Sequence, residues 1–221
     1  MDILISSIIV IVLSIAGYVY SMVTFKSEAT LKNIKSYLPN SFKTISLLVA
    51  PMLVGALIII LFKVFHEVPL ISATKLLILI MILFPIAFSD YKNHTVPNKI
   101  LLVALGARII IYGIEFIISV PKAVEVLKYD LLGAVIIGVF FLLCLLLFKN
   151  SIGMGDVKLF FIMGLYQGLW GCVNSIFWSL IASFFVSVGL LISKKKNKKD
   201  AIPFCPSILV GTIFAIAMSG M

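Results

Sequence analysis

Charged residues are scarce in this chain: they make up 12% of its 221 residues, whereas 62% of the residues are hydrophobic. A soluble domain of this length needs more polar surface than such a composition provides. The chain also lacks a long polar tract that could form a soluble domain beside the apolar part. The sequence therefore predicts a single membrane-embedded domain over residues 1–221.

Cysteines are few and far apart. Cys144, Cys172 and Cys205 form no C-x-x-C pair, so the sequence predicts neither a zinc site nor a disulfide framework. We expect no metal and no organic cofactor. Acidic residues are also few, which leaves a net charge of +9. Because the lysines lie in short loops and form no basic face with interleaved aromatic residues, we expect the lipid bilayer, and not nucleic acid, as the partner of this charge.

Seven apolar runs are long enough to cross roughly 30 Å of hydrocarbon, which takes about 17 to 25 residues. They fall at about 3–25, 44–65, 70–89, 99–119, 129–148, 157–193 and 202–219. The sixth run is too long for one helix, so we expect two spans with a tight turn near Gln167-Gly168, Gly171 or Asn174. The sequence thus predicts an all-α, polytopic transmembrane bundle of about eight spans, one of them short.

The distribution of lysines predicts the orientation of this bundle. With eight spans and the N-terminus outside, the cytoplasmic segments are 26–43, 90–99, 149–158 and 194–200. These segments hold thirteen lysines against four on the opposite side, as the positive-inside rule requires. A seven-span count would instead place "SKKKNKKD" outside. The lysines therefore favour eight spans in a cell membrane.

Two carboxylates lie at the cytoplasmic ends of predicted spans. Asp90 ends the third span in "FPIAFSDYKNHTVPNKI", and Asp156 begins the sixth in "GMGDVKLF". Two carboxylates at one membrane depth can act as an aspartyl hydrolase pair, in which one deprotonates a water and the other protonates or hydrogen-bonds the peptide carbonyl. The simpler alternative is that each Asp only caps or flanks a helix end.

Residues beside the two carboxylates suit a binding or supporting role. Gly153 and Gly155 allow close approach of backbone and a positive φ before a helix, so that a substrate strand can lie against the loop. Lys158 either holds the nearby carboxylate ionised or anchors the helix end at the interface. Pro97 and Asn98 predict a helix start, with Pro in the first turn and Asn as the cap.

These motifs resemble those of the type IV prepilin peptidases, which are GxGD intramembrane aspartyl proteases. "SDYKNHTVPNKI" is similar to the family's first Asp with its basic stretch and Pro-Asn, and "GMGDVKLF" to the second-aspartate signature. "IPFCPSILVG" at 202–211 is similar to the start of the family's last helix. The resemblance covers about 70–219. It implies that Asp90 and Asp156 are the catalytic pair of an endopeptidase that cuts the leader peptide of pilin-like precursors, on the cytoplasmic side and after a glycine.

Two features depart from the family pattern. Many bacterial members carry a cytoplasmic insertion after the first helix, with paired C-x-x-C motifs that are associated with N-methylating the new terminus. The corresponding loop here, 26–43, has 18 residues and no cysteine. We therefore expect a peptidase without N-methyltransferase activity. The second departure is Cys205, which stands where the family pattern has Gly.

Helix ends predict different roles for the two carboxylates. Asp90 ends its helix, where unpaired carbonyls disfavour an anion, whereas Asp156 begins its helix, where unpaired N–H groups favour one. We therefore expect Asp90 to act as the acid and Asp156 as the base.

Charges within the membrane allow a second class of function. Arg108 falls near the middle of the fourth span, where a charge is costly and usually faces the bundle interior. Glu115 shares its helix face but lies about 10 Å along the axis, too far for an easy direct pair. Together with Asp90 and Asp156, these residues can be read as the relay of an ion or proton transporter. The location of both Asp residues at one membrane face favours the endopeptidase.

Overall fold

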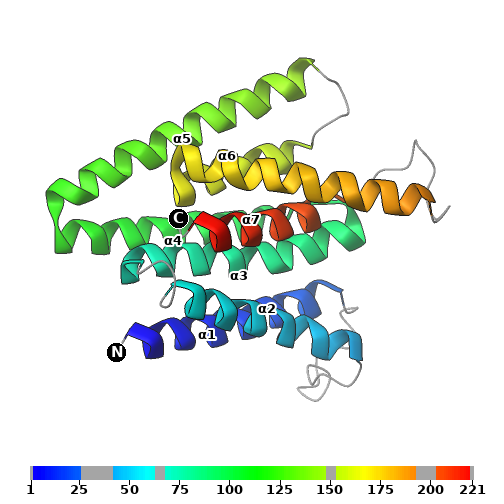
Figure 1. The fold of residues 1–221 in the computed structure, drawn as a ribbon, viewed down its shortest axis with the longest axis horizontal. Coiled ribbons are helices and arrows are strands. Elements are labelled where there is room, and N and C mark those ends of the chain that lie inside the picture. Colours follow the sequence, from blue (N-terminus) through cyan, green and yellow to red (C-terminus); the bar gives the residue numbers. More distant parts are fainter. Residues whose placement is uncertain (1, 26–41, 63–67, 148–152, 193–202, 220–221) are drawn as a thin grey trace.

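The computed structural model describes residues 2–25, 42–62, 68–147, 153–192 and 203–219, and their regular structure is helical throughout (Figure 1). The elements are α1 (Asp2–Phe25), α2 (Phe42–Leu61), α3 (Leu70–Asn93), α4 (Asn98–Ile118), α5 (Val120–Leu147), α6 (Met154–Ile192) and α7 (Cys205–Ser219). The predicted all-α fold is confirmed.

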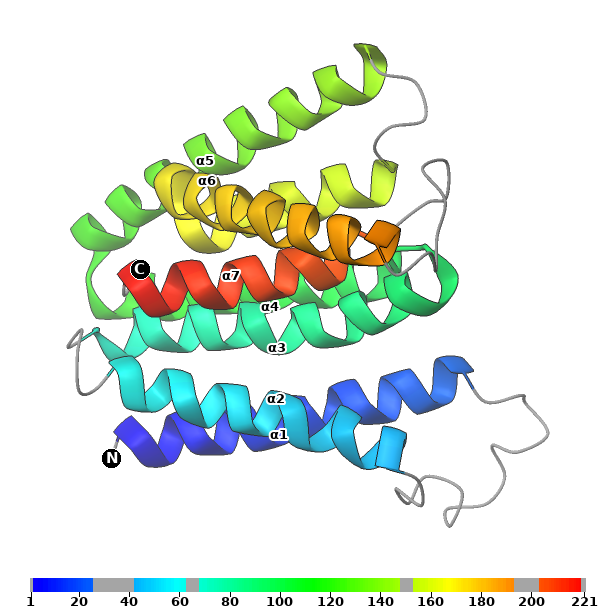
Figure 2. The ribbon, with the colours of Figure 1, turned by 45° about the vertical axis from the view of Figure 1, so that its right-hand side comes forward.

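The longest element, α6, is two helices joined at Gly168, whose φ of 66° and ψ of −172° are not helical. This backbone region is essentially restricted to glycine. The first half of α6 runs toward the end of the bundle where α4 joins α5, and the second half returns beside α7 (Figures 1 and 2). The predicted split of the sixth apolar run is therefore confirmed, at the first of the three predicted positions, and α6 passes through the bundle twice.

Length and composition make this a polytopic helical membrane protein. The helices α1, α3, α4, α5 and α6 are long and apolar enough to cross a membrane, and α2 and α7 contribute shorter apolar stretches, Leu48–Leu61 and Cys205–Ser219. The first half of α6, Met154 to Gln167, has 14 residues and is about 21 Å long. It is shorter than the hydrocarbon core of about 30 Å.

The helix ends that matter for function meet at one end of the bundle. There α3 and α5 end, and α4, α6 and α7 begin (Figures 1 and 2). We call it the carboxylate end, because Asp90 lies in the last turn of α3 and Asp156 in the first turn of α6. The N-terminus of α1 and the C-terminus of α7 lie at the opposite end (Figure 2).

Most of the lysines that predict the orientation lie in residues 26–41, 148–152 and 193–202, outside the described residues. The described helix ends that lead into these segments, those of α1, α5 and α6, all lie at the carboxylate end (Figures 1 and 2). The helix ends next to the lysine-rich segments therefore lie on one side of the bundle, as the predicted orientation requires.

The core of the bundle is centred on α3, which contacts α1, α2, α4, α6 and α7. Its middle is almost fully buried, with Leu76, Leu77, Leu79, Ile80 and Leu83 at most 1% exposed. Near the end of α3, Asp90 is also buried, at 8% exposed, so its carboxylate must find its partners within the protein.

Candidate active site

Asp90 is held by the way α3 ends. His94 adopts a left-handed conformation, with φ 51° and ψ 39°, and its N–H donates to the Asp90 carbonyl oxygen at 2.9 Å. Such a residue commonly closes a helix by satisfying one of its last carbonyls. In the same turn, the Ser89 hydroxyl donates to the Thr95 carbonyl at 3.1 Å. The Asp90 backbone is thereby fixed at the end of a buried helix, and the residue is only 8% exposed.

Asp156 is held by the loop that begins α6. The N–H of Gly153 donates to Asp156 Oδ2 at 3.3 Å, and the N–H of Asp156 donates to the Gly153 carbonyl at 3.0 Å. A carboxylate in the first turn of a helix is stabilised by the unpaired N–H groups there. Asp156 is half-buried, so it combines a fixed position with access for water.

Cys205, the first residue of α7, brings the two carboxylates to one place. Its backbone N–H donates to Asp90 Oδ2 at 2.9 Å, and its Sγ lies 3.7 Å from Asp156 Oδ1. From the sequence alone, Cys205 is only a departure from a motif, and its contacts with both carboxylates are not predicted. The available signal was "IPFCPSILVG", which places a helix start at the level of both Asp residues.

The contact between Asp90 and Cys205 also corrects the argument from helix ends. Asp90 ends α3, but its carboxylate accepts a hydrogen bond from the first N–H of α7. Both carboxylates therefore face the N-terminus of a helix, and the premise that only Asp156 does so is wrong. Helix ends alone no longer distinguish the base from the acid.

The two glycines before Asp156 act differently from the expectation. Gly168 is the only glycine with a positive φ among the described residues, so neither Gly153 nor Gly155 uses the freedom predicted for it. Close approach does occur at Gly155, where an added Cβ would lie 2.8 Å from Val96 Cβ. Gly155 thus lets the loop between α3 and α4 pack against the start of α6. This contact joins the two segments that carry the carboxylates.

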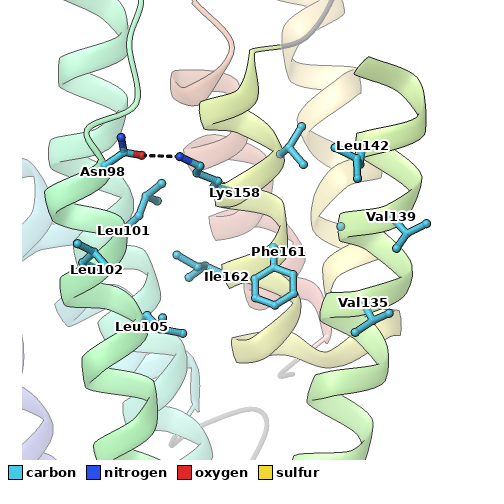
Figure 3. A pocket seen from close by; sticks show the side chains of 12 residues that line it. Asn98, Leu101, Leu102, Leu105, Val135, Val139, Leu142, Lys158, Phe161 and Ile162 are labelled. Atoms are coloured by element: carbon cyan, nitrogen blue, oxygen red, sulfur yellow. Dashed lines mark hydrogen bonds between the residues drawn. The ribbon is translucent and has the colours of Figure 1, made fainter. Parts of the chain in front are cut away.

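Lys158 and Asn98 form a second link between these segments. Lys158 Nζ donates to Asn98 Oδ1 at 3.1 Å (Figure 3). The predicted helix start at Pro97 and Asn98 is confirmed, but Pro97 occupies the cap position and no side chain caps the helix. Asn98 instead turns its amide to Lys158, so its expected capping role is wrong. Lys158 thus contacts α4, and among the described residues it forms no ion pair with Asp156.

Arg108 belongs to a separate buried cluster. It is 0% exposed, and its guanidinium contacts Asp130 of α5 through Nη2 and Glu115 through Nη1, the latter at 3.2 Å. The expectation that Glu115 is too far to pair is wrong, because both side chains extend along the shared helix face. Lys75 Nζ lies 3.8 Å from Asp130. In this cluster two cations meet two carboxylates, which compensates charges that would be costly in isolation.

The same cluster supports the turn in α6. Arg108 Nε donates to the Leu165 carbonyl at 2.9 Å, and the Tyr112 hydroxyl lies 3.3 Å from the same oxygen. The last carbonyls of a helix have no partner within it, and Leu165 lies in the last turn before Gly168. Side chains of α4 thus stabilise the point where α6 reverses.

The arrangement at the carboxylate end suits acid–base hydrolysis. Asp90 and Asp156 come from different helices, both contact Cys205, and differ in burial. One carboxylate can remove a proton from water while the other donates a proton or hydrogen bond to a carbonyl. In the described part of the chain, no three His, Cys, Asp or Glu side chains are grouped so that they could hold a metal ion.

Comparisons with known proteins point to the same chemistry. Residues 77–191 match the family model for the type IV leader peptidase family. The chain is also 25% identical, over 142 residues, to the prepilin leader peptidase/N-methyltransferase of Bacillus subtilis (strain 168). That alignment covers 62% of this chain and 53% of the relative, so the match spans about half of the relative's length. No solved structure matches the chain significantly.

Proposed function

Because the chain belongs to the type IV leader peptidase family, we propose that it is an aspartic endopeptidase that removes the leader peptide of pilin-like precursors. Asp90 and Asp156 are its catalytic pair. The observation that carries the proposal is the meeting of these carboxylates at Cys205. Gly153, Gly155, Pro97, Asn98 and Lys158 support the pair by fixing the two loops around it.

Cleavage takes place at the cytoplasmic face of the membrane in this proposal. The carboxylate end then faces the cytoplasm, whereas the start of α1 and the end of α7 face the outside of the cell. With both halves of α6 counted, the single domain has about eight spans. The lysines of residues 26–41, 148–152 and 193–202, segments adjacent in sequence to helix ends at the carboxylate end, support this orientation through the positive-inside rule.

A transporter is the alternative from another class, and the contacts argue against it. A relay needs ionisable groups that exchange protons or ions along a path. Arg108 and Glu115 are instead paired with each other and with Asp130, whereas Asp90 and Asp156 meet at Cys205. Among the described residues these are two clusters with different partners, and only one contains the family motifs.

One reaction tests the proposed function and the absence of methyl transfer together. Purified protein in detergent is incubated with a pilin-like precursor and S-adenosylmethionine, and the products are identified by mass spectrometry. We expect a mature product that begins after the leader's glycine and carries no added methyl group. An uncut precursor would contradict the peptidase, and ion flux through liposomes containing the protein would favour the transporter. A mature product heavier by one methyl group would contradict the absence of methyltransferase activity.

A further inference from the structure

Three phenylalanine rings connect α5, α6 and the start of α7. The rings of Phe141 on α5 and Phe160 on α6 are stacked, with their centroids 4.0 Å apart and an angle of 15° between their planes. The Phe160 ring also meets the ring of Phe204, which directly precedes α7, with centroids 6.1 Å apart and an angle of 56°. Aromatic pairs stabilise a contact beyond the burial of their surface. Phe160 is therefore the central member of a contact between three helical segments.

Phe160 is closely connected to one of the two carboxylates. It lies four residues after Asp156, so the two side chains are neighbours on the same face of the helix. Phe160 is 0% exposed, and its carbonyl oxygen lies 3.9 Å from Cys172 Sγ in the second half of α6. Because both its ring and its backbone are enclosed, Phe160 helps to fix the turn of α6 that carries Asp156.

Phe204 is connected in the same way to the other carboxylate. Its carbonyl oxygen accepts a hydrogen bond from the Ile208 N–H at 3.0 Å, in the first turn of α7. Cys205 follows directly, and its N–H donates to Asp90 Oδ2 at 2.9 Å. The first N–H groups of a helix have no partner within it, so the position of this donor depends on where α7 begins. The contact of Phe204 with Phe160 thus relates the start of α7 to the start of α6.

We propose that Phe160 is a positioning residue, whose ring keeps the start of α7 at a fixed distance from Asp156. Because the first N–H of α7 binds Asp90, this aromatic contact sets the spacing of the two carboxylates. A misplacement of about 1 Å in a reacting group can cost a hundredfold in rate. The inference rests on the proposed peptidase function and adds the contact that keeps its two acid–base groups in register.

Phe160→Leu removes the ring and keeps an apolar side chain, and Phe62→Leu is the matched control. Phe62 is 4% exposed and belongs to the same apolar core, but it directly follows α2, which ends opposite the carboxylate end (Figure 2). We expect both variants to lower Tm by similar amounts. Only Phe160→Leu should lower kcat, by about tenfold or more, with KM for the precursor within about twofold of the wild type. Adding Phe204→Leu to Phe160→Leu should slow cleavage little further, because both substitutions remove one contact.

The thiol of Cys205 gives a second readout that does not depend on activity. Its Sγ lies 3.7 Å from Asp156 Oδ1, and a hydrogen-bonded S–H group absorbs at a lower infrared frequency than a free one. In difference spectra against Cys205→Ser, we expect Phe160→Leu and Phe204→Leu to move this band toward the free-thiol frequency and Phe62→Leu to leave it in place.

Equal kcat values in Phe160→Leu and Phe62→Leu, or a thiol band that neither Phe160→Leu nor Phe204→Leu moves, would overturn the proposal. A wild-type protein that cleaves no precursor would instead contradict the peptidase function itself. The thiol band would still report the contact in that case, so the two failures are distinguishable.

Discussion

Cys205 is the residue through which the two carboxylates are connected. Its N–H binds Asp90 and its thiol contacts Asp156, and the residue is 0% exposed. The backbone contact persists whatever side chain is present, whereas the thiol contact and the available volume depend on the side chain. Substitutions of Cys205 can therefore separate the backbone contact with Asp90 from the contact and packing of the side chain at Asp156.

We expect Cys205→Ser to keep kcat/KM within about tenfold of the wild type, because a hydroxyl replaces the thiol and one hydrogen bond is worth about 1 kcal/mol. Cys205→Leu should reduce kcat/KM by about tenfold to a hundredfold, because overpacking costs about 1 to 3 kcal/mol. Cys144→Leu, at a half-buried position on α5, is the control. Wild-type cleavage by Cys205→Leu would show that this side chain does not lie between the carboxylates.

Gly155 offers a second test at the scale of single residues. A Cβ at this position would lie 2.8 Å from Val96 Cβ, which is too close for two carbon atoms. We expect Gly155→Ala to displace the start of α6 and to lower kcat/KM by about tenfold or more. Adding Val96→Gly removes the opposing Cβ and should restore most of the cleavage. Failure of this rescue would contradict the contact as the cause.

The residues of the site show what a sequence can and cannot predict. Asp90 and Asp156 are identifiable because each stands in a short motif at the end of an apolar run. The role of Cys205 depends on a contact between residues separated by 115 positions, which no local pattern encodes. Axial rise alone predicts that Arg108 and Glu115 lie too far apart to pair, but the two long side chains extend toward each other and close that distance.

At the scale of elements, the reversal of α6 depends on glycine at two places. Gly168 has the positive φ that makes the turn. On α5, a Cβ at Gly133 would overlap the backbone of Gly168 and Leu169, so Gly133 lets α5 pack directly against the turn. Small residues allow this kind of close helix contact within membranes. Sequence length predicted that the apolar run must be split, but among three candidate positions only the structure selects Gly168.

We expect Gly168→Ala to lower the free energy of unfolding by about 1 to 3 kcal/mol, because its backbone region is essentially restricted to glycine. Gly189→Ala is the control in the same element, since an added Cβ there meets no atom within 4 Å. Thermal unfolding in detergent measures both variants, and a loss of this size lowers Tm by about 2 to 4 °C per kcal/mol for a chain of this length. Equal Tm values would contradict a strained turn at Gly168.

At the scale of the whole molecule, the bundle combines two clusters with different tasks. The Arg108 cluster ties α3, α4, α5 and the turn of α6 together through paired charges. The carboxylate end gathers the starts of α4, α6 and α7 around the end of α3 (Figure 2). Apolar runs predict the all-α architecture and the approximate positions of its helices, although α5 begins at Val120, nine residues before the predicted span. The helix contacts that complete the site depend on packing between distant segments and required the structure.

Single substitutions of the two carboxylates test the central claim most directly. Asp90→Asn and Asp156→Asn keep the size of each side chain and an oxygen acceptor for its N–H partner, but each removes the ability to exchange a proton. We predict that each variant unfolds at a temperature close to that of the wild type and cleaves the pilin-like precursor at least about a thousandfold more slowly, since both groups act in the same step. Cleavage at the wild-type rate by either folded variant would remove that residue from the catalytic pair and contradict the account.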